Sequence, residues 1–263
     1  ERQIILPAGK TIDVANREAW VFPIGTIFLK TFLGEDATGK RIPVETRVIR
    51  RTDNPDPFEQ YKFAVYKWNE SGTDATLLDI KARTPVEVKS GTQTRTHQIP
   101  SLEDCEKCHQ ANDTPVIGFD ELRLNAPAAP GGQMQLAAFA AAGAFNAPMP
   151  AQPMRITDPD PMTEKVKQYI YGNCVHCHNG SNPQVFSLRP EEFPMSVVRQ
   201  QTIGSGTARG VRVVPGMPEM SILYRQMTRM NLTLGFNPMP PVGVQIADAE
   251  AVAMVRTWIL GLK

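Results

Sequence analysis

The four cysteines of this 263-residue chain form two copies of a single pattern and leave no cysteine over. The first copy is Cys105-Glu-Lys-Cys108-His109 and the second is Cys174-Val-His-Cys177-His178. Two thiols three residues apart can each form a thioether with one vinyl group of a porphyrin, and the adjacent histidine then lies beneath the iron. The pattern therefore predicts two covalently bound haem c groups, with His109 and His178 as proximal ligands.

Other uses of paired cysteines explain less of this pattern. Zinc accepts four thiolates in tetrahedral geometry, but it does not need a histidine directly after each pair. A thioredoxin-like redox pair belongs in a βαβ context, and structural disulfides rarely close so small a ring. We therefore prefer two haems over one haem, and both over zinc.

Charge and hydropathy narrow the classes of partner. The 28 basic and 27 acidic residues nearly cancel, which gives no indication of binding to nucleic acid or to an anionic membrane surface. No apolar run approaches the roughly 20 residues of a membrane span, so no transmembrane segment is expected. Because haem c is attached outside the cytoplasmic membrane, the motifs predict a periplasmic or secreted protein. The chain begins at Glu1, which we interpret as the result of processing.

The residue pattern predicts an α+β protein with an antiparallel β module at its N-terminus. Residues 1–100 contain short runs of β-forming residues, separated by Gly, Pro, Asp and Asn at intervals of about 8 to 12 residues. These runs are Trp20–Phe22, Thr26–Leu29, Val44–Val48 and Tyr61–Tyr66. Residues 101–147 follow as the first haem-binding segment.

The second half of the chain reads as a mainly helical, class I cytochrome c-like domain. Residues 148–161 are too rich in proline for a helix or a central strand, so they are predicted to form a stiff linker. In residues 162–263, Thr163 can cap a helix that leads directly into Cys174. Asp248 can cap a terminal helix with one apolar stripe, formed by Val252, Val255, Trp258 and Ile259.

The sixth ligand of each iron decides between electron transfer and chemistry on a bound substrate. For the second haem we predict Met239, because it stands in the proline-stiffened segment Asn237–Gly243 just before the terminal helix. Most of the 11 methionines are expected to fill apolar interior space. The alternatives to Met239 are Met217, Met220, Met227 and Met230.

The distal ligand of the first haem is less constrained by the sequence. Of four histidines, two are proximal ligands and His176 lies inside its own attachment loop, so only His97 is free. We prefer Met134, which follows Gly131-Gly132, with His97 as the alternative. A five-coordinate iron remains a third alternative. The arginines that follow the second motif, including Arg212, are predicted to be solvated.

Several stretches together resemble a family of secreted bacterial dihaem c-type cytochromes, sometimes fused to pyrroloquinoline-quinone sugar dehydrogenases. The similarity covers nearly the whole chain, and each of its regions contributes. In the β module, the similar stretches are Trp20–Phe32, Glu45–Ile49 and Tyr66–Glu70. In the first haem segment they are His97–Ser101, Gly118-Phe and Leu124-Asn125. In the second haem segment they are Tyr171–His178, Ser221–Tyr224, Met239–Pro241 and Trp258-Ile259. Family members usually carry further N-terminal sequence, so the sheet of this chain is expected to be incomplete or to be completed by a neighbour.

The motifs and the resemblance together predict an electron-transfer protein rather than an enzyme. It is expected to accept electrons from a separate dehydrogenase and to pass them to another cytochrome, an oxidase or a terminal acceptor. The alternative is a dihaem peroxidase, in which one haem iron is open and reduces peroxide. The sequence offers no convincing acid–base residue for that chemistry, because its histidines are already assigned.

Overall fold

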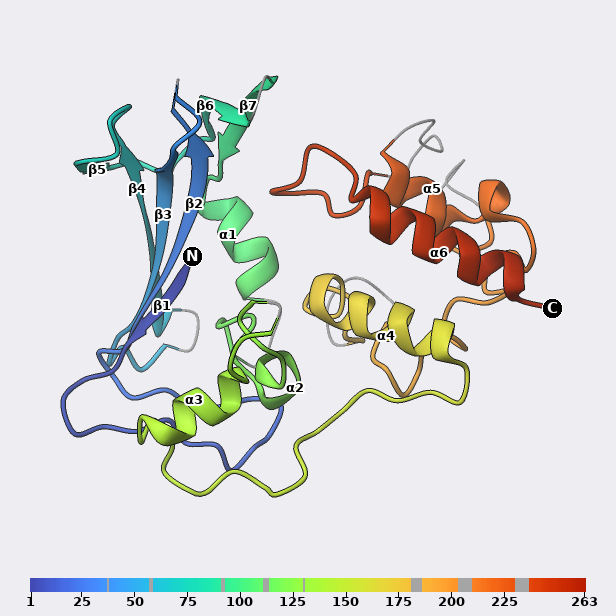
Figure 1. Ribbon diagram of the computed structural model, residues 1–263, viewed down its shortest axis with the longest axis horizontal. Coiled ribbons are helices and arrows are strands. Elements are labelled where there is room, and N and C mark those ends of the chain that lie inside the picture. Colours follow the sequence, from blue (N-terminus) through green and yellow to red (C-terminus); the bar gives the residue numbers. More distant parts are fainter. Residues whose placement is uncertain are drawn as a thin grey trace. The chain divides into compact units, whose positions relative to one another are not determined.

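The chain divides into two compact units, Glu1–Met154 and Arg155–Lys263. The computed structural model describes residues 1–36, 38–56, 59–90, 93–110, 114–129, 131–180, 186–202, 210–229 and 237–263. The predicted α+β class is confirmed, because an antiparallel sheet occupies the N-terminal part and the described remainder is mainly helical (Figure 1). The division between the units falls inside residues 148–161, and residues 148–160 contain no helix or strand.

The first unit is built on an antiparallel sheet. Its three long strands are β2 (Ile27–Glu35), β3 (Arg41–Arg51) and β4 (Tyr61–Trp68), which pair in sequence order. The shorter strands extend both sides: β1 (Arg2–Ile5) pairs with β2, β5 (Ala75–Leu77) pairs with β4, and β6 (Thr84–Ser90) joins β2 and pairs with β7 (Gln93–Ile99). The sequence pattern located the long strands and missed the short ones.

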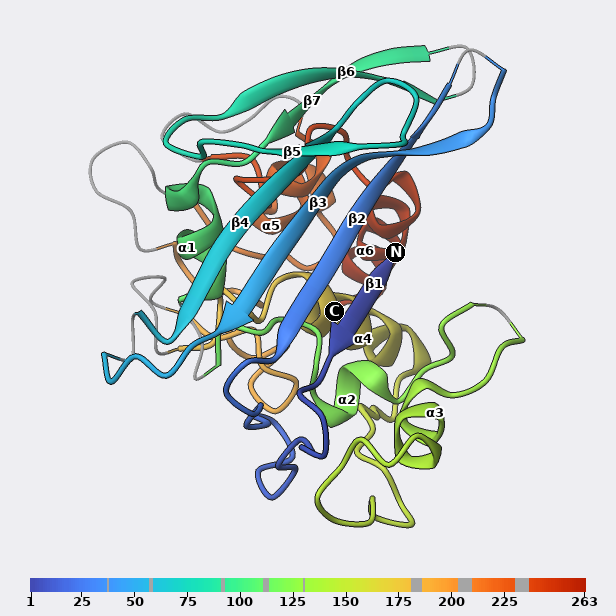
Figure 2. The same ribbon diagram turned by 90° about the vertical axis from the view of Figure 1, so that its left-hand side faces the viewer.

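Successive side chains along each strand point to opposite sides of the sheet, so the sheet has two different faces. Cross-strand partners point to the same face, so the register fixes which side chains lie together. We call one of these faces the inner face, and helix α1 (Leu102–His109) lies over it (Figures 1 and 2). The inner face carries Phe28, Lys30 and Phe32 of β2, Glu45, Arg47 and Ile49 of β3, and Phe63, Val65 and Lys67 of β4.

The core of the first unit joins the sheet to the first haem-binding segment. Phe28 of the inner face packs with Trp20 and Phe22, and with Val116 and Leu136 from residues 101–147. Residues 101–147 are thus part of the same unit as the sheet, and they contain the short helices α2 (Glu121–Leu124) and α3 (Gln135–Ala141). The predicted strand Trp20–Phe22 is wrong. Its aromatic residues are buried in a loop that makes only an isolated bridge at Val21, because their apolar surface fills the core without a sheet.

In the second unit, helix α4 (Pro161–Asn173) begins earlier than predicted. Asp160 is the N-cap, and its carboxylate accepts a hydrogen bond from the Thr163 backbone N–H at 2.8 Å. Proline at the first helical position needs no N–H partner, so Pro161 opens the helix instead of ending the linker. The predicted cap, Thr163, lies within the helix, where its hydroxyl accepts a hydrogen bond from the Trp258 indole at 3.1 Å.

The terminal helix α6 (Ala249–Gly261) packs against α4 in the core of this unit. Val166 and Ile170 of α4 are buried with Val255, Trp258 and Ile259 of α6. Asp248 caps α6 as predicted, by accepting from the Ala251 N–H at 3.0 Å. A short 3₁₀ turn, η2 (Pro218–Met220), and α5 (Ile222–Thr228) also contact α6. Across the described residues, no helix combines the length and apolar character that a membrane span requires.

Helix α1, which carries the first motif, is fixed at its N-terminus by a buried carboxylate. Ser101 and Asp104 form a capping box, in which each side chain accepts from the backbone N–H of the other residue. Arg83 donates to both Asp104 oxygens, at 2.5 and 2.6 Å. Hydrogen bonds from Arg83 are the main cause that lowers the pKa of Asp104 to about 2, against a smaller opposing effect of burial.

We predict that Asp104→Asn lowers the free energy of unfolding by about 2 kcal/mol at pH 7, the equivalent of the lowered pKa. Because the folded-state pKa lies below the unfolded value, this contribution is complete above pH 4 and is lost as the pH falls towards 2. Urea unfolding at pH 7 and at pH 2.5 measures it. The exposed neighbour Glu103 forms a surface ion pair with Lys107, so Glu103→Gln should change stability by less than about 0.5 kcal/mol. Equal losses in the two variants would contradict this assignment.

Candidate functional site

The first C-x-x-C-H motif occupies one face of helix α1. Cys105, Cys108 and His109 stand at positions i, i+3 and i+4, which are neighbours on a helix surface. Both cysteines are half-buried, and neither is in a disulfide. Burial is the main cause that raises the pKa of Cys105 to about 11, so its sulfur is held as a protonated thiol. An S–H group is the form that adds across a vinyl double bond to give a thioether.

The imidazole of His109 is held in one orientation by the backbone. Its Nδ1 lies 2.5 Å from the carbonyl oxygen of Pro115, and the ring packs against Phe63 of β4 with centroids 5.4 Å apart. A carbonyl oxygen only accepts, so Nδ1 must carry a proton, and in the neutral ring Nε2 is then the nitrogen whose lone pair could bind a metal. Sequence reasoning did not identify Pro115, because a backbone acceptor leaves no side-chain signature.

The second motif begins where helix α4 ends. Cys174 is the C-cap of α4, and its carbonyl accepts from the N–H of Cys177 at 3.0 Å and from that of His178 at 2.9 Å. The motif therefore closes into a single tight turn. Burial raises the pKa of Cys174 to about 12, so this thiol is also protonated.

His178, the predicted proximal ligand of the second haem, lies in a largely apolar setting. The His178 ring is 4.5 Å from the ring of Phe186, and its buried Nδ1 has no hydrogen-bond partner among the described residues. Burial, followed by the charges of His176 and Arg212, lowers the pKa of His178 to about 4. The imidazole is therefore neutral at physiological pH, which is the form that binds a metal.

Arg212 is buried instead of solvated, contrary to the sequence prediction. Its guanidinium lies 4.2 Å over the Phe186 ring and donates to the Ser196 carbonyl at 2.8 Å. Only 9% of the residue remains exposed, and burial lowers the pKa of the guanidinium. The burial of Arg212 could not be predicted from the sequence, because the Phe186 ring that covers it is distant in the chain.

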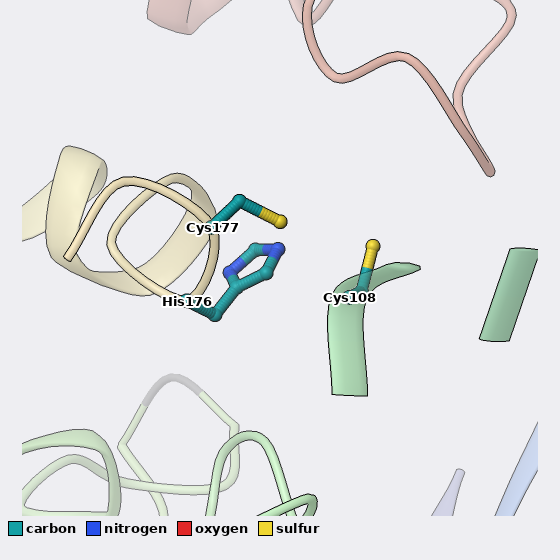
Figure 3. A group of neighbouring side chains, drawn as sticks. All are labelled: Cys108, His176 and Cys177. Atoms are coloured by element: carbon teal, nitrogen blue, oxygen red, sulfur yellow. The ribbon is translucent and has the colours of Figure 1, made fainter. Parts of the chain in front are cut away.

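Within each unit, the described residues do not assemble a four-ligand zinc site. Figure 3 shows His176 and Cys177 leaving the loop after α4 on the same side, and their ligand atoms lie within 4.8 Å of each other. Cys108, also labelled there, belongs to the first unit. Within either unit alone, the described residues bring together no group of three histidine, cysteine or acidic ligands. A structural zinc normally has four.

Met239, the predicted distal ligand of the second haem, lies in a loop that is tied to α5. Its backbone N–H donates to the Gln226 carbonyl at 3.1 Å, and Arg229 donates to the Pro240 carbonyl at 2.8 Å. Among the alternatives, Met217 and Met220 are 55% and 63% exposed, while Met227 packs on the core. Met230 lies outside the described residues. Met239 is the half-buried methionine on an anchored loop, and its ligand role stays a prediction.

The two candidates for the distal ligand of the first haem have different surroundings. Met134 is the N-cap of α3 and is 37% exposed, so its thioether reaches the surface of the first unit. His97 stands on β7, and its Nε2 lies 2.8 Å from a carboxylate oxygen of the buried Glu45. These surroundings do not distinguish Met134 from His97 as the distal ligand of the first haem, and both remain predictions.

Searches for a matching protein-family model, a curated relative or a similar solved structure found none. The resemblance to secreted dihaem cytochromes therefore stays a prediction, and the geometry of the two motifs carries the functional argument.

A buried polar side chain in the second unit indicates a missing partner beside Met239. Gln226 of α5 is 3% exposed, and neither its amide oxygen nor its amide nitrogen has a hydrogen-bond partner among the described residues. An unsatisfied buried amide costs roughly 1 to 3 kcal/mol. Together with the two C-x-x-C-H motifs, whose cysteines form no disulfide, this orphaned amide fits a site completed by a bound group such as haem.

We predict that Gln226→Leu stabilises the haem-free protein by about 1 to 2 kcal/mol, because it removes an unsatisfied amide at nearly constant volume. In the haem-loaded protein the gain should vanish, because the bound group then supplies the partner. Denaturant unfolding of both forms measures the difference, with the exposed Gln200→Leu as control. An equal gain in both forms would show that the amide does not face the cofactor.

Proposed function

We propose that this chain is a dihaem c-type cytochrome that transfers electrons between redox proteins. The observation that carries the proposal is that each C-x-x-C-H motif places two cysteines, neither of them in a disulfide, beside an imidazole whose surroundings suit metal binding. In the first motif, the Pro115 carbonyl fixes the tautomer of His109. In the second, burial keeps His178 neutral. Haem c, when bound, would supply reversible one-electron chemistry at its iron.

The residues of this chain would hold the two cofactors in different ways. Cys105 and Cys108 would bind the first haem from a helix face, and Cys174 and Cys177 would bind the second from a turn. The crossing of α4 and α6 positions the second motif, and this arrangement supports a class I cytochrome c-like domain in residues 162–263. Met239 would complete the second iron's coordination from its anchored loop.

Methionine ligation raises the reduction potential of a haem, which suits an electron carrier that accepts from a dehydrogenase. The near-zero net charge implies that partners are recognised by small local contacts around each haem edge. The donor is proposed to be a separate dehydrogenase and the acceptor another cytochrome or an oxidase. Haem attachment places the protein in the periplasm or outside the cell.

We predict that Met239→Ala removes the contribution of one haem to the near-infrared sulfur-to-iron charge-transfer band of the ferric protein and lowers the reduction potential of that haem. The exposed Met220→Ala is the matched control and should leave both properties unchanged. Absorption spectroscopy and potentiometric titration measure the two effects. A variant with the full band intensity of the native protein would assign the ligand of the second haem to another methionine.

The reaction with hydrogen peroxide distinguishes an electron-transfer protein from the alternative, a dihaem peroxidase. A peroxidase requires an acid–base group at an open iron. The fully reduced protein should deliver two electrons to a soluble cytochrome acceptor. Stopped-flow mixing with hydrogen peroxide should give no catalytic turnover with a reduced donor. Rapid peroxide turnover would contradict the carrier proposal and favour the enzyme, with the His97–Glu45 pair as the first acid–base candidate.

A further inference from the structure

Arg212 carries a buried positive charge that no acidic residue of the described chain balances. Its guanidinium donates to the Ser196 carbonyl at 2.8 Å, and a carbonyl oxygen is a neutral acceptor. Burial lowers the pKa of Arg212, and among the described residues no carboxylate raises it again. An arginine nevertheless keeps its proton in proteins. The second unit therefore contains a desolvated cation whose charge is uncompensated.

Hydrogen bonds of the backbone fix the position of this cation. The Arg212 N–H donates to the Gln200 carbonyl at 2.8 Å, and the Arg212 carbonyl accepts from the N–H of Leu223 on α5 at 3.0 Å. The side chain is held separately, by Ser196 and by the Phe186 ring. The charge thus belongs to the folded core of the unit and not to a mobile surface side chain.

The cation lies one aromatic ring away from the second C-x-x-C-H motif. The guanidinium carbon of Arg212 is 4.2 Å from the centroid of the Phe186 ring, and that ring is 4.5 Å from the ring of His178. Both separations are direct contacts, so the guanidinium and the imidazole share the same partly desolvated surroundings. A charge in such surroundings is screened less than one in water. Arg212 is therefore placed to act on a metal bound by His178.

The two predicted proximal histidines differ in a second respect. Nδ1 of His109 lies 2.5 Å from the Pro115 carbonyl, and an acceptor at this nitrogen makes an imidazole a stronger electron donor to a metal. The buried Nδ1 of His178 has no hydrogen-bond partner among the described residues. A weaker donor and a nearby cation both disfavour the extra positive charge of a ferric iron. Both differences raise the reduction potential of the second haem relative to the first.

We propose that Arg212, held against Phe186 beside His178, raises the reduction potential of the second haem and makes this haem the electron exit of the chain. The inference rests on the proposed function. Electrons move spontaneously towards the higher potential, so within this chain they would flow from the first haem to the second. The dehydrogenase would deliver to the first haem, and the acceptor would take electrons from the second. The role of Arg212 is to position a charge, not to bind the iron.

The test measures the two reduction potentials of the haem-loaded protein by spectroelectrochemical titration. The variant with Cys105→Ala and Cys108→Ala, which should bind only the second haem, assigns the potentials and should titrate at the higher one. Arg212→Gln should lower that potential by roughly 59 mV, which is a tenfold change in a one-electron equilibrium. Arg212→Lys keeps the charge and should retain most of the native potential.

Two controls separate the charge of Arg212 from other effects. Arg256→Gln removes an equal charge from an exposed position on α6, where Arg256 pairs with Glu219, and should leave both potentials unchanged. Paramagnetic resonance of the ferric protein reports the axial ligands of each iron. Its signals should be the same in Arg212→Gln as in the native protein, because only a charge has been removed.

Each result supports or overturns the inference. An unchanged potential in Arg212→Gln, an equal drop in Arg212→Lys, or altered axial ligation would overturn the electrostatic role. A second haem that titrates at the lower of the two potentials would overturn the direction of electron flow. Should Arg212→Gln fail to fold, Arg212→Met removes the charge at similar length and decides in its place. A native protein without two covalently bound haems would instead refute the proposed function.

Discussion

The hydrogen bond between His109 and the Pro115 carbonyl is the interaction on which the functional account of the first unit depends. It orients the imidazole at the end of α1, so that Nε2 of the neutral ring could bind a metal. Helix α1 is in turn fixed by the buried Asp104 and its bonds to Arg83 and Ser101. The sheet, the cap and the loop to Pro115 therefore all serve to hold one imidazole.

The second unit also holds a neutral imidazole, but by a different physical effect. His178 has no hydrogen-bonded Nδ1 among the described residues, and its environment is the Phe186 ring with Arg212 beyond it. Burial, rather than an acceptor, keeps this imidazole neutral. The two haems would consequently differ in the polarity around their ligands, which is one of the means by which proteins set different reduction potentials.

Much of this organisation was predictable from local patterns. The long strands, the α6 cap at Asp248 and both motifs follow from periodicity, cap chemistry and cysteine spacing. The start of α4 at Asp160 and the loop conformation of Trp20–Phe22 were not predicted, because proline at a helix start and aromatic core filling both override local propensity. The buried Arg212 and the orphaned Gln226 depend on contacts between distant residues, which one sequence does not reveal.

The intact mass of the protein, produced in a host that attaches haem c and denatured before measurement, tests the central claim most directly. Covalent attachment at both motifs predicts the polypeptide mass increased by two haem groups, and Cys105→Ala with Cys108→Ala should leave an increase of one. A mass equal to that of the bare polypeptide, or the polypeptide plus zinc under native conditions, would contradict the account.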